Sequence, residues 1–254
     1  MISLAGKAAL ITGGSRGIGA ACVRLFARAG ADIVFNYHRD AEAAERVAQE
    51  SRRQGTRVEF LKADLSKMSP AEKLVKFAHE RLGRLDILVA NAGIWNVEDS
   101  PIEKMSENEW DQMMAANLKS VYSVIHFSVP HMIRQHSGRI VAISSTAGQR
   151  GVALHSHYGA SKGGIISLVK GLSTELAPHN ILVNSVAPGW VDTDMSKPVF
   201  KDKKTYKQIL EKQPLGRVAT AEETAGPVLF LASDLANFIT GEILNVNGGS
   251  VLCG

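Results

Sequence analysis

The chain has 254 residues, a formal net charge of +4 and an isoelectric point of about 9.1. Its lysines and arginines are spread along the sequence without aromatic–basic interleaving, so the charge indicates a solvated basic surface and not a nucleic-acid partner. No long apolar run, signal peptide, cysteine framework or metal-ligand motif is present, so we expect a cytoplasmic protein without a membrane span, disulfide or metal site.

A short apolar strand, Ala8–Thr12, leads into a glycine-rich loop and then a helical run that ends near Gly30. Glycines permit a tight turn and let backbone N–H groups approach a pyrophosphate, whose charge the helix N-terminus favours. The spacing TGxxxGxG differs from the more common GxGxxG, and a turn without a ligand is the alternative. In this strand–helix context we predict a dinucleotide site formed by Gly13, Ser15, Arg16, Gly17, Ile18 and Gly19.

The second predicted strand, Asp32–Tyr37, carries information on the cofactor at its end. An acidic residue there selects NAD through the ribose 2′-hydroxyl, whereas a basic residue suits the 2′-phosphate of NADP. No acid occurs before Asp40, and Arg16 can lie on the same side as Arg39. We therefore favour NADP(H) over NAD(H), although Arg39 could simply begin the next helix in solvent. The predicted adenosine contacts are Asn36, Tyr37, His38 and Arg39.

Strands and helices continue to alternate through the middle of the chain. Helices are expected over Ala41–Gln54 and Pro70–Leu82, and strands over Val58–Leu61 and Leu85–Val89. Small and polar residues follow both strands, which suits the approach of a flat ligand to the backbone. These predicted contacts are Asp64 and Leu65 after the first strand, and Asn91, Ala92 and Gly93 after the second.

The next helix carries an unusual interior residue. Ser106 and Glu109 predict a capping box at its start, and Asn117 lies in mid-run. Asparagine is a mediocre residue for a helix interior, so Asn117 indicates a purpose other than propensity. The two alternatives are a bond to a backbone carbonyl at a helix kink and a held water molecule.

The apolar run Ile140–Ile143 reads as a buried strand that ends in Ser144, Ser145 and Thr146. Tyr158 and Lys162 follow, four residues apart, on one face of a helix that runs to about Ala177. A lysine one turn away can stabilise a phenolate, so the phenol becomes a usable proton donor beside a strand-end hydroxyl. A lone tyrosine–lysine pair usually has no function, so this pair gains its meaning from the glycine loop.

The last third repeats the pattern. A strand over Ile181–Val186 ends in four predicted cofactor contacts, Pro188, Gly189, Val191 and Thr193. A lysine-rich stretch, Lys197 to Lys212, is predicted as a flexible lid within about 190–213. A helix from Thr220 or Ala221 to Ala232 and a strand over Ile243–Val246 follow. The alternation, without linker or repeat, predicts one α/β domain over 1–254, with a Rossmann-type, doubly wound parallel sheet of about seven strands.

With these motifs in order, the sequence resembles the short-chain dehydrogenase/reductase family over essentially its whole length. Each motif is modest alone, but the set is specific. It consists of Thr12–Gly19, Asp64, Asn91-Ala92-Gly93, Asn117, Ser145, Tyr158 with Lys162, and Pro188-Gly189 with Thr193. The most similar branch is the 3-oxoacyl-carrier-protein reductases, on the spacing from Ser145 to Tyr158 and the closing Val246–Gly249.

The resemblance implies a catalytic set of Asn117, Ser145, Tyr158 and Lys162. Tyr158 would be the general acid in reduction and the base in oxidation. Lys162 would lower the pKa of the phenol and bond the nicotinamide ribose. Ser145, and not Ser144, would hold the substrate oxygen, a choice that the strand alone does not make. Asn117 would anchor a water molecule in a proton relay, and the family's usual assembly implies a homotetramer.

The substrate stays open at this stage. The family's carrier-binding reductases grip an acidic carrier protein with basic side chains beside the active site, and the aligned positions read His136 and His179 here. The lysines of the stretch 197–212 could replace them, or could be a solvated helix face. His155 and His157 either line the substrate mouth or are ordinary loop residues.

Three functions are compared. The first is an NADPH-dependent reductase of ketones, including 3-oxoacyl thioesters. The second is an NAD(P)-dependent dehydrogenase of a sugar, polyol or other secondary alcohol, which would use the same residues in the oxidising direction. The third, a non-catalytic cofactor-binding regulatory protein, is disfavoured because all four predicted catalytic residues are present.

Overall fold

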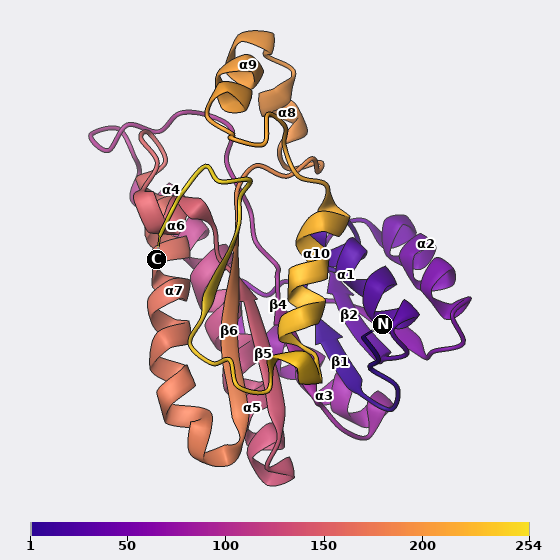
Figure 1. Cartoon of the computed structure of the whole chain (residues 1–254). Coiled ribbons are helices and arrows are strands. Elements are labelled where there is room, and N and C mark those ends of the chain that lie inside the picture. Colours follow the sequence, from indigo (N-terminus) through magenta and orange to yellow (C-terminus); the bar gives the residue numbers. More distant parts are fainter. Residues whose placement is uncertain (1, 254) are drawn as a thin grey trace.

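Seven parallel strands form one sheet in the order β3-β2-β1-β4-β5-β6-β7, with helices on both faces (Figure 1). The computed structural model describes residues 2–253. The strands are β1 Ala8–Ile11, β2 Asp32–Tyr37, β3 Val58–Lys62, β4 Ile87–Ala90, β5 Gly138–Ile143, β6 Ile181–Pro188 and β7 Ile243–Val246. The strand order reverses between β1 and β4, as in a doubly wound sheet, and this fold prediction is confirmed.

Helices connect successive strands. They are α1 Gly17–Arg28, α2 Ala41–Arg52, α3 Met68–Leu82, α4 Glu107–Met114, α5 Ser120–Gln135, α6 Thr146–Arg150, α7 Ser156–Leu176, α8 Lys197–Phe200, α9 Lys203–Glu211 and α10 Ala221–Leu231. A π-helical segment, η1 Ala115–Lys119, joins α4 to α5, and the short 3-10 turns are η2 Ala177–His179 and η3 Asp234–Ala236. Capping boxes begin α4 at Ser106 and α10 at Thr220, close to the predicted starts.

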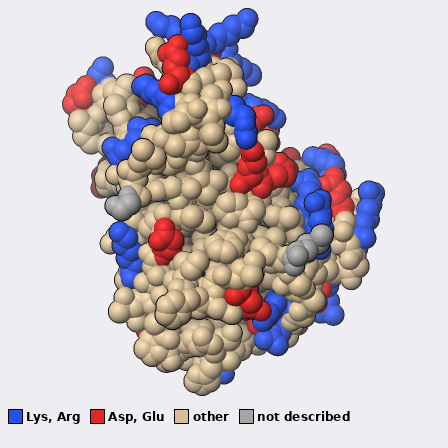
Figure 2. Space-filling view, viewed as in Figure 1, with Lys and Arg blue, Asp and Glu red and all other residues tan. Residues whose placement is uncertain are grey.

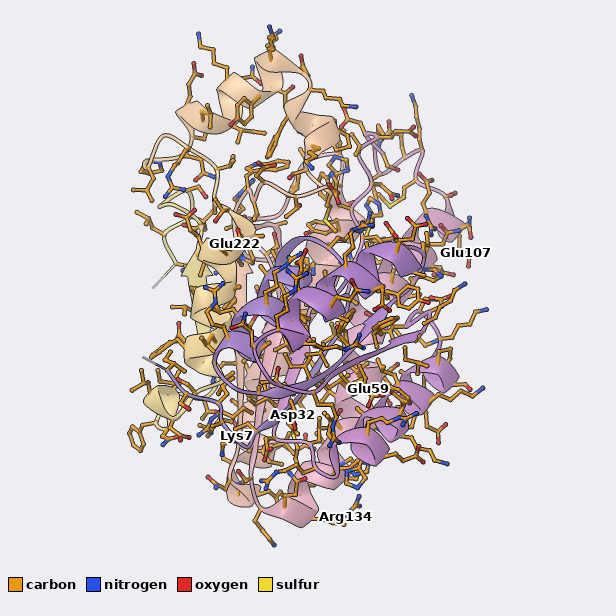
Figure 3. The ribbon with its side chains drawn as sticks, turned by 90° about the vertical axis from the view of Figure 1, so that its right-hand side faces the viewer. Lys7, Asp32, Glu59, Glu107, Arg134 and Glu222 are labelled. Carbon is orange, nitrogen blue, oxygen red and sulfur yellow. The ribbon has the colours of Figure 1, made fainter. Side chains whose placement is uncertain are left out.

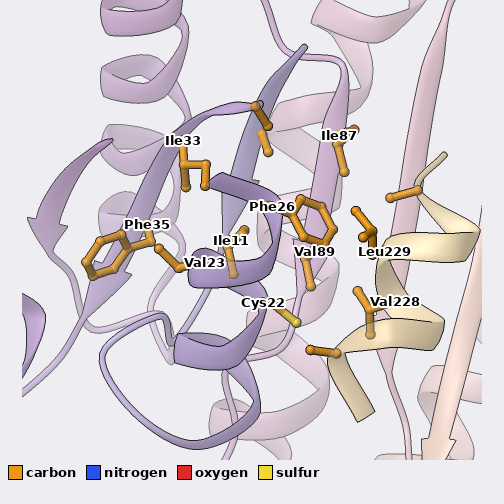
Figure 4. Packing of buried hydrophobic residues seen from close by; sticks show 14 of the residues in the cluster. Ile11, Cys22, Val23, Phe26, Ile33, Phe35, Ile87, Val89, Val228 and Leu229 are labelled. Atoms are coloured by element: carbon orange, nitrogen blue, oxygen red, sulfur yellow. The ribbon is translucent and has the colours of Figure 1, made fainter. Parts of the chain in front are cut away.

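Alternate residues of each strand divide the core between the two faces. Ile11 packs under α1, α2 and α10, whereas its neighbour Leu10 packs under α3, α5 and α7. Phe26 and Cys22 fill the first layer (Figure 4). Burial raises the pKa of the Cys22 thiol to about 12, which keeps it a neutral core residue. Both faces are therefore covered, as a parallel sheet requires.

Several strand bounds differ from the predictions by one or two residues. β4 begins at Ile87 and not at Leu85, because the Gln135 side chain takes both backbone groups of Leu85: its oxygen accepts from the Leu85 N–H at 3.0 Å, and its amide donates to the Leu85 carbonyl at 2.9 Å. β6 extends to Pro188, two residues beyond the predicted end. The strands run from the level of Lys7 and Asp32 toward the level where α10 begins (Figure 3). Within residues 2–253, no helix is long and apolar enough to span a membrane.

Candidate active site

A cavity of about 420 Å³ lies at the carboxyl edge of the sheet, over the ends of β1, β2, β4, β5 and β6. The predicted cofactor residues that line it are Gly13, Ser15, Arg16, Gly17, Ile18, Asn36, Tyr37, His38, Arg39, Asp64, Leu65, Asn91, Ala92, Gly93, Lys162, Pro188, Gly189, Val191 and Thr193. Gly19 and Tyr158 do not line it. Another cavity of similar volume, between Lys7 and Arg139 at the opposite edge, contains none of these predicted residues.

The glycine loop needs its glycines for close packing. Gly13 has φ +67°, a conformation that side chains rarely adopt. A Cβ at Gly19 would lie 2.1 Å from the Gly13 carbonyl oxygen, so any side chain there would collide with the loop backbone. Gly19 therefore supports the loop from behind and does not face the cavity.

Side chains that we predicted as cofactor contacts also hold the loop in place. The Asn36 side-chain oxygen Oδ1 accepts from the Gly13 N–H at 2.9 Å, and the side-chain amide of Asn36 donates to the Ala63 carbonyl at 3.0 Å. Asn91 donates to the Thr12 carbonyl at 2.8 Å. Thr12 Oγ1 in turn accepts from the N–H groups of Asn91 and Ala92. The role of Thr12 could not be assigned from its type, because it depends on a contact between two distant strands.

Basic residues gather at the adenosine end of the cavity. Arg16, His38 and Arg39 are exposed and line its rim. The nearest acid, Asp40, caps α2 by accepting from the Ala43 N–H at 2.8 Å. Asp64 is held by Ser66, whose hydrogen bonds lower the pKa of the Asp64 carboxyl. The guanidinium groups of Arg16 and Arg39 therefore share this end of the cavity with carboxylates that already hold hydrogen bonds within the chain.

The two strand-end serines have different surroundings. Ser144 is 2% exposed, donates to the Val186 carbonyl at 3.1 Å and accepts from the Ser185 hydroxyl at 2.8 Å. Ser145 lines the cavity and caps α6 by accepting from the Ala147 N–H at 3.1 Å. Its hydroxyl also lies close enough to Tyr158 to act on the pKa of the phenol, in the lowering direction. Both serines line the cavity, but hydrogen bonds to β6 occupy the Ser144 hydroxyl, so the Ser145 hydroxyl is the more available of the two.

Tyr158 and Lys162 lie together on α7, as their spacing predicts. Lys162 Nζ is 5.9 Å from the centre of the Tyr158 ring and donates to the Ile143 carbonyl at 2.9 Å. Burial lowers the pKa of Lys162 to about 8. Burial also raises the pKa of Tyr158 to about 12, against a smaller lowering by the Ser145 hydrogen bond. The lowered phenol pKa that we expected is therefore not found in the chain alone, because desolvation outweighs the contribution of Ser145.

Asn117 lies in the π-helical segment η1 and is fully buried. Its side-chain oxygen accepts from the Ile94 N–H at 2.7 Å, and its amide donates to the Ile94 carbonyl at 3.1 Å. It also donates to Ser161 at 3.2 Å. Of the two alternatives for this residue, the bond to a backbone carbonyl at a helix irregularity is confirmed, and the side chain fixes the loop after β4.

Aromatic rings of the loops that follow β4 and β6 line the outer cavity. Trp95 packs edge-on against Tyr158, with ring centres 4.6 Å apart, and against His155 at 4.2 Å. Trp190 lies 6.4 Å from Trp95 and packs on Phe200 of α8 at 5.7 Å. These contacts join four segments that are distant in sequence, so periodicity gives no signal for them.

The predicted lid is helical, and it carries charge. The stretch 197–212 contains six lysines and two acidic residues, so its formal net charge of +4 equals that of the whole chain. Figure 2 shows these cations grouped over α8 and α9. In contrast, His136 and His179 lie just before β5 and β6, at the amino edge of the sheet. Our expectation that these positions flank the active site is wrong within one chain, because parallel strands carry the site at their other end.

Comparisons with known proteins agree with this arrangement. A family model described as enoyl-(acyl carrier protein) reductase matches residues 13–250. A 3-oxoacyl-(acyl-carrier-protein) reductase of Chlamydia muridarum is 42% identical over 97% of this chain and 98% of its own length. One of Staphylococcus epidermidis is 38% identical over 96% and 98%.

Solved structures match over the same length. A dehydrogenase/reductase from Sinorhizobium meliloti 1021 superposes with a TM-score of 0.91 at 36% identity, over 98% of this chain and 97% of that one. A short-chain dehydrogenase from Burkholderia cenocepacia J2315 in complex with NADP gives a TM-score of 0.89 at 32% identity, over 97% and 98%. The chain belongs to the short-chain dehydrogenase/reductase family and is an NAD(P)-dependent oxidoreductase of C=O and CH–OH groups.

Proposed function

We propose that this protein is an NADPH-dependent carbonyl reductase that acts on 3-oxoacyl thioesters. The observation that carries the proposal is that the Ser145 hydroxyl and the Lys162 ammonium line the cavity, and the Tyr158 phenol lies beside them. Two hydroxyl groups beside one cation can stabilise a substrate carbonyl oxygen as it gains negative charge, and one of them can then protonate it. The names of the 38–42% identical relatives support the thioester as substrate.

The residues of the chain would divide the work as follows. The reduced nicotinamide supplies the hydride to the carbonyl carbon. Tyr158 gives its proton to the carbonyl oxygen, and Ser145 donates a hydrogen bond to the same oxygen. Lys162, held by the Ile143 carbonyl, stabilises the phenolate that this leaves and bonds the nicotinamide ribose. Asn117 fixes the loop over the site and anchors the water through which Tyr158 regains a proton from solvent.

We propose NADP(H) as the preferred cofactor. Arg16 and Arg39 line the adenosine end of the cavity, where guanidinium groups suit a 2′-phosphate. Asp40 is occupied in capping α2, so its carboxylate is poorly available to a ribose 2′-hydroxyl. The remaining predicted cofactor residues would hold the pyrophosphate at the glycine loop and the nicotinamide beneath residues 188–193.

The segment 190–213 is proposed as a lid that closes over substrate. Thr193 lies next to the glycine loop, since a Cβ at Gly17 would be 3.3 Å from Thr193 Cγ2. The six lysines of the stretch 197–212 would face an anionic carrier, and an acidic carrier protein fits them better than it fits His136 and His179. We place this enzyme in the cytoplasm, as a homotetramer built on the helices around Asn117 and Tyr158 and on β7.

A dehydrogenase of a sugar, polyol or other secondary alcohol is the second candidate. The same three side chains serve hydride transfer in either direction, and the structural neighbour from Sinorhizobium meliloti is described as a dehydrogenase/reductase. The aromatic walls of the outer cavity favour the first candidate, because a polyol offers little apolar surface to rings.

The test is loss of NADPH absorbance with a short 3-oxoacyl thioester, run beside NADH. We expect turnover with NADPH and at least about tenfold lower kcat/KM with NADH, the size of effect that one lost charge-assisted contact produces. Equal or better use of NADH would refute the cofactor assignment. No turnover with either cofactor would refute the thioester and leave the alcohol dehydrogenase.

A further inference from the structure

Trp95 lies across the approach to Tyr158. It belongs to the loop after β4, and its ring plane stands at 86° to that of Tyr158 with ring centres 4.6 Å apart. The indole lines the cavity, whereas Tyr158 does not. A carbonyl that reaches the Tyr158 hydroxyl from the cavity must therefore pass beside the indole.

The position of this indole is set by packing on several sides. His155, which is 7% exposed, lies behind it at 4.2 Å and is itself 3.6 Å from the Asp99 carboxylate. Trp190 faces it at 6.4 Å. From Trp190 the ring contacts continue to Phe200, so Trp95 is the ring that joins the site to the lid.

No hydrogen bond fixes Trp95. Its indole nitrogen is buried and has no partner among the residues that the structure describes. A smaller side chain at this position would therefore leave no polar partner unsatisfied, and it would remove only ring packing. The size of residue 95 can consequently be varied without dismantling a hydrogen-bond network.

We propose that Trp95 determines substrate specificity by limiting the smaller of the two substituents on the reacting carbonyl. The inference rests on the proposed function and deepens it. With an indole against Tyr158, one substituent can extend along the apolar wall toward Trp190 and the lid, but the other must be slender, such as a methyl group. The substrate class is therefore ketones with one small and one longer apolar arm, and not ketones with two bulky arms.

The test compares ethyl 3-oxobutanoate with ethyl 3-oxo-3-phenylpropanoate, which differ only in a methyl or phenyl group on the ketone. We expect Trp95→Ala to raise the phenyl-to-methyl ratio of kcat/KM by about tenfold or more over the unaltered enzyme, with Trp95→Phe between them. Trp110→Phe is the matched control, because Trp110 lies on α4 and does not line the cavity. A ratio in Trp95→Ala within about twofold of the unaltered enzyme would overturn the proposal.

Binding is measured in parallel, by calorimetry of each ester with each variant saturated with NADP⁺. The thermal shift on adding NADP⁺ reports whether the Trp95 variants keep their folded cofactor site. If the unaltered enzyme turns over neither these esters nor a short 3-oxoacyl thioester, the proposed function fails, and the ratio of the two dissociation constants of the esters then decides the role of Trp95. A shift of that ratio toward the phenyl ester in Trp95→Ala supports the role, and an unchanged ratio contradicts it.

Discussion

Lys162 carries a buried positive charge at a strand end where water is scarce. Its ammonium group has one hydrogen-bond acceptor within the part of the chain that the structure describes, the Ile143 carbonyl, and the residue is 5% exposed. Burial disfavours the charged form and lowers its pKa from 10.5 to about 8. The buried Lys162 ammonium group therefore lowers the stability of the folded protein, and a hydrogen bond to a bound ribose hydroxyl would offset part of that loss.

This residue gives a prediction on pH. Between pH 8 and 10.5 the unfolded chain binds a proton at Lys162 that the folded chain has largely lost, so stability from this group rises with pH across that window. We expect the free energy of unfolding of the unaltered protein, relative to Lys162→Met, to increase by about 3 kcal/mol over that range. Urea unfolding of both proteins at pH 7.5 and 10 measures it. A constant difference would show that Lys162 is not desolvated.

The two serines at the end of β5 show what residue type alone could and could not predict. The run Ser144-Ser145 predicted a hydroxyl at the carboxyl edge, but not which one, because strand alternation places either on a face that could meet a ligand. In the structure the Ser144 hydroxyl is occupied by hydrogen bonds with Val186 and Ser185 of the neighbouring strand. The raised pKa of Tyr158 could not be predicted from local sequence either, since it arises from burial by residues that are distant in sequence.

At the scale of elements, the π-helical segment η1 has one visible task. It points Asn117 at the main chain of Ile94, so a helix on one side of the sheet holds the loop that carries Trp95. An asparagine in the middle of a predicted helix indicated a specific contact, because asparagine has a low helix propensity. The partner could not be predicted, because it lies 23 residues away on another segment.

Replacing Asn117 by alanine should loosen that loop. The Ile94 N–H and carbonyl would lose their partners, and a destabilisation of about 2 kcal/mol is expected from two such losses at a partly buried site. Urea unfolding measures it, and hydrogen exchange at the Ile94 amide should accelerate. Asn108→Ala is the control, since Asn108 is exposed on α4 and bonds only Gln112 in the described chain. Equal stability of the two variants would show that η1 does not support the loop.

At the scale of the whole molecule, the loops that follow the seven parallel strands lie at one edge of the sheet. This arrangement explains how much of the fold and of the site could be predicted from the sequence. Apolar runs and capping residues such as Thr220 with Glu223 are local signals, so the elements and their order were predictable. Because the strands are parallel, the motif residues at their carboxyl ends were expected to lie close together at that edge. The ring contacts of Trp95 and the location of His136 at the opposite edge depend on three-dimensional neighbours and direction, and local patterns do not report these.

We propose Tyr158 as the proton donor in carbonyl reduction, and the roles of the other site residues depend on it. The most direct test is Tyr158→Phe, which removes one hydroxyl and keeps the ring against Trp95. We predict that kcat for NADPH-dependent ketone reduction falls by about 10³-fold, in the range for loss of a general acid, while NADPH binding measured by nucleotide fluorescence changes little. A variant that kept near-normal turnover would contradict the account at its centre.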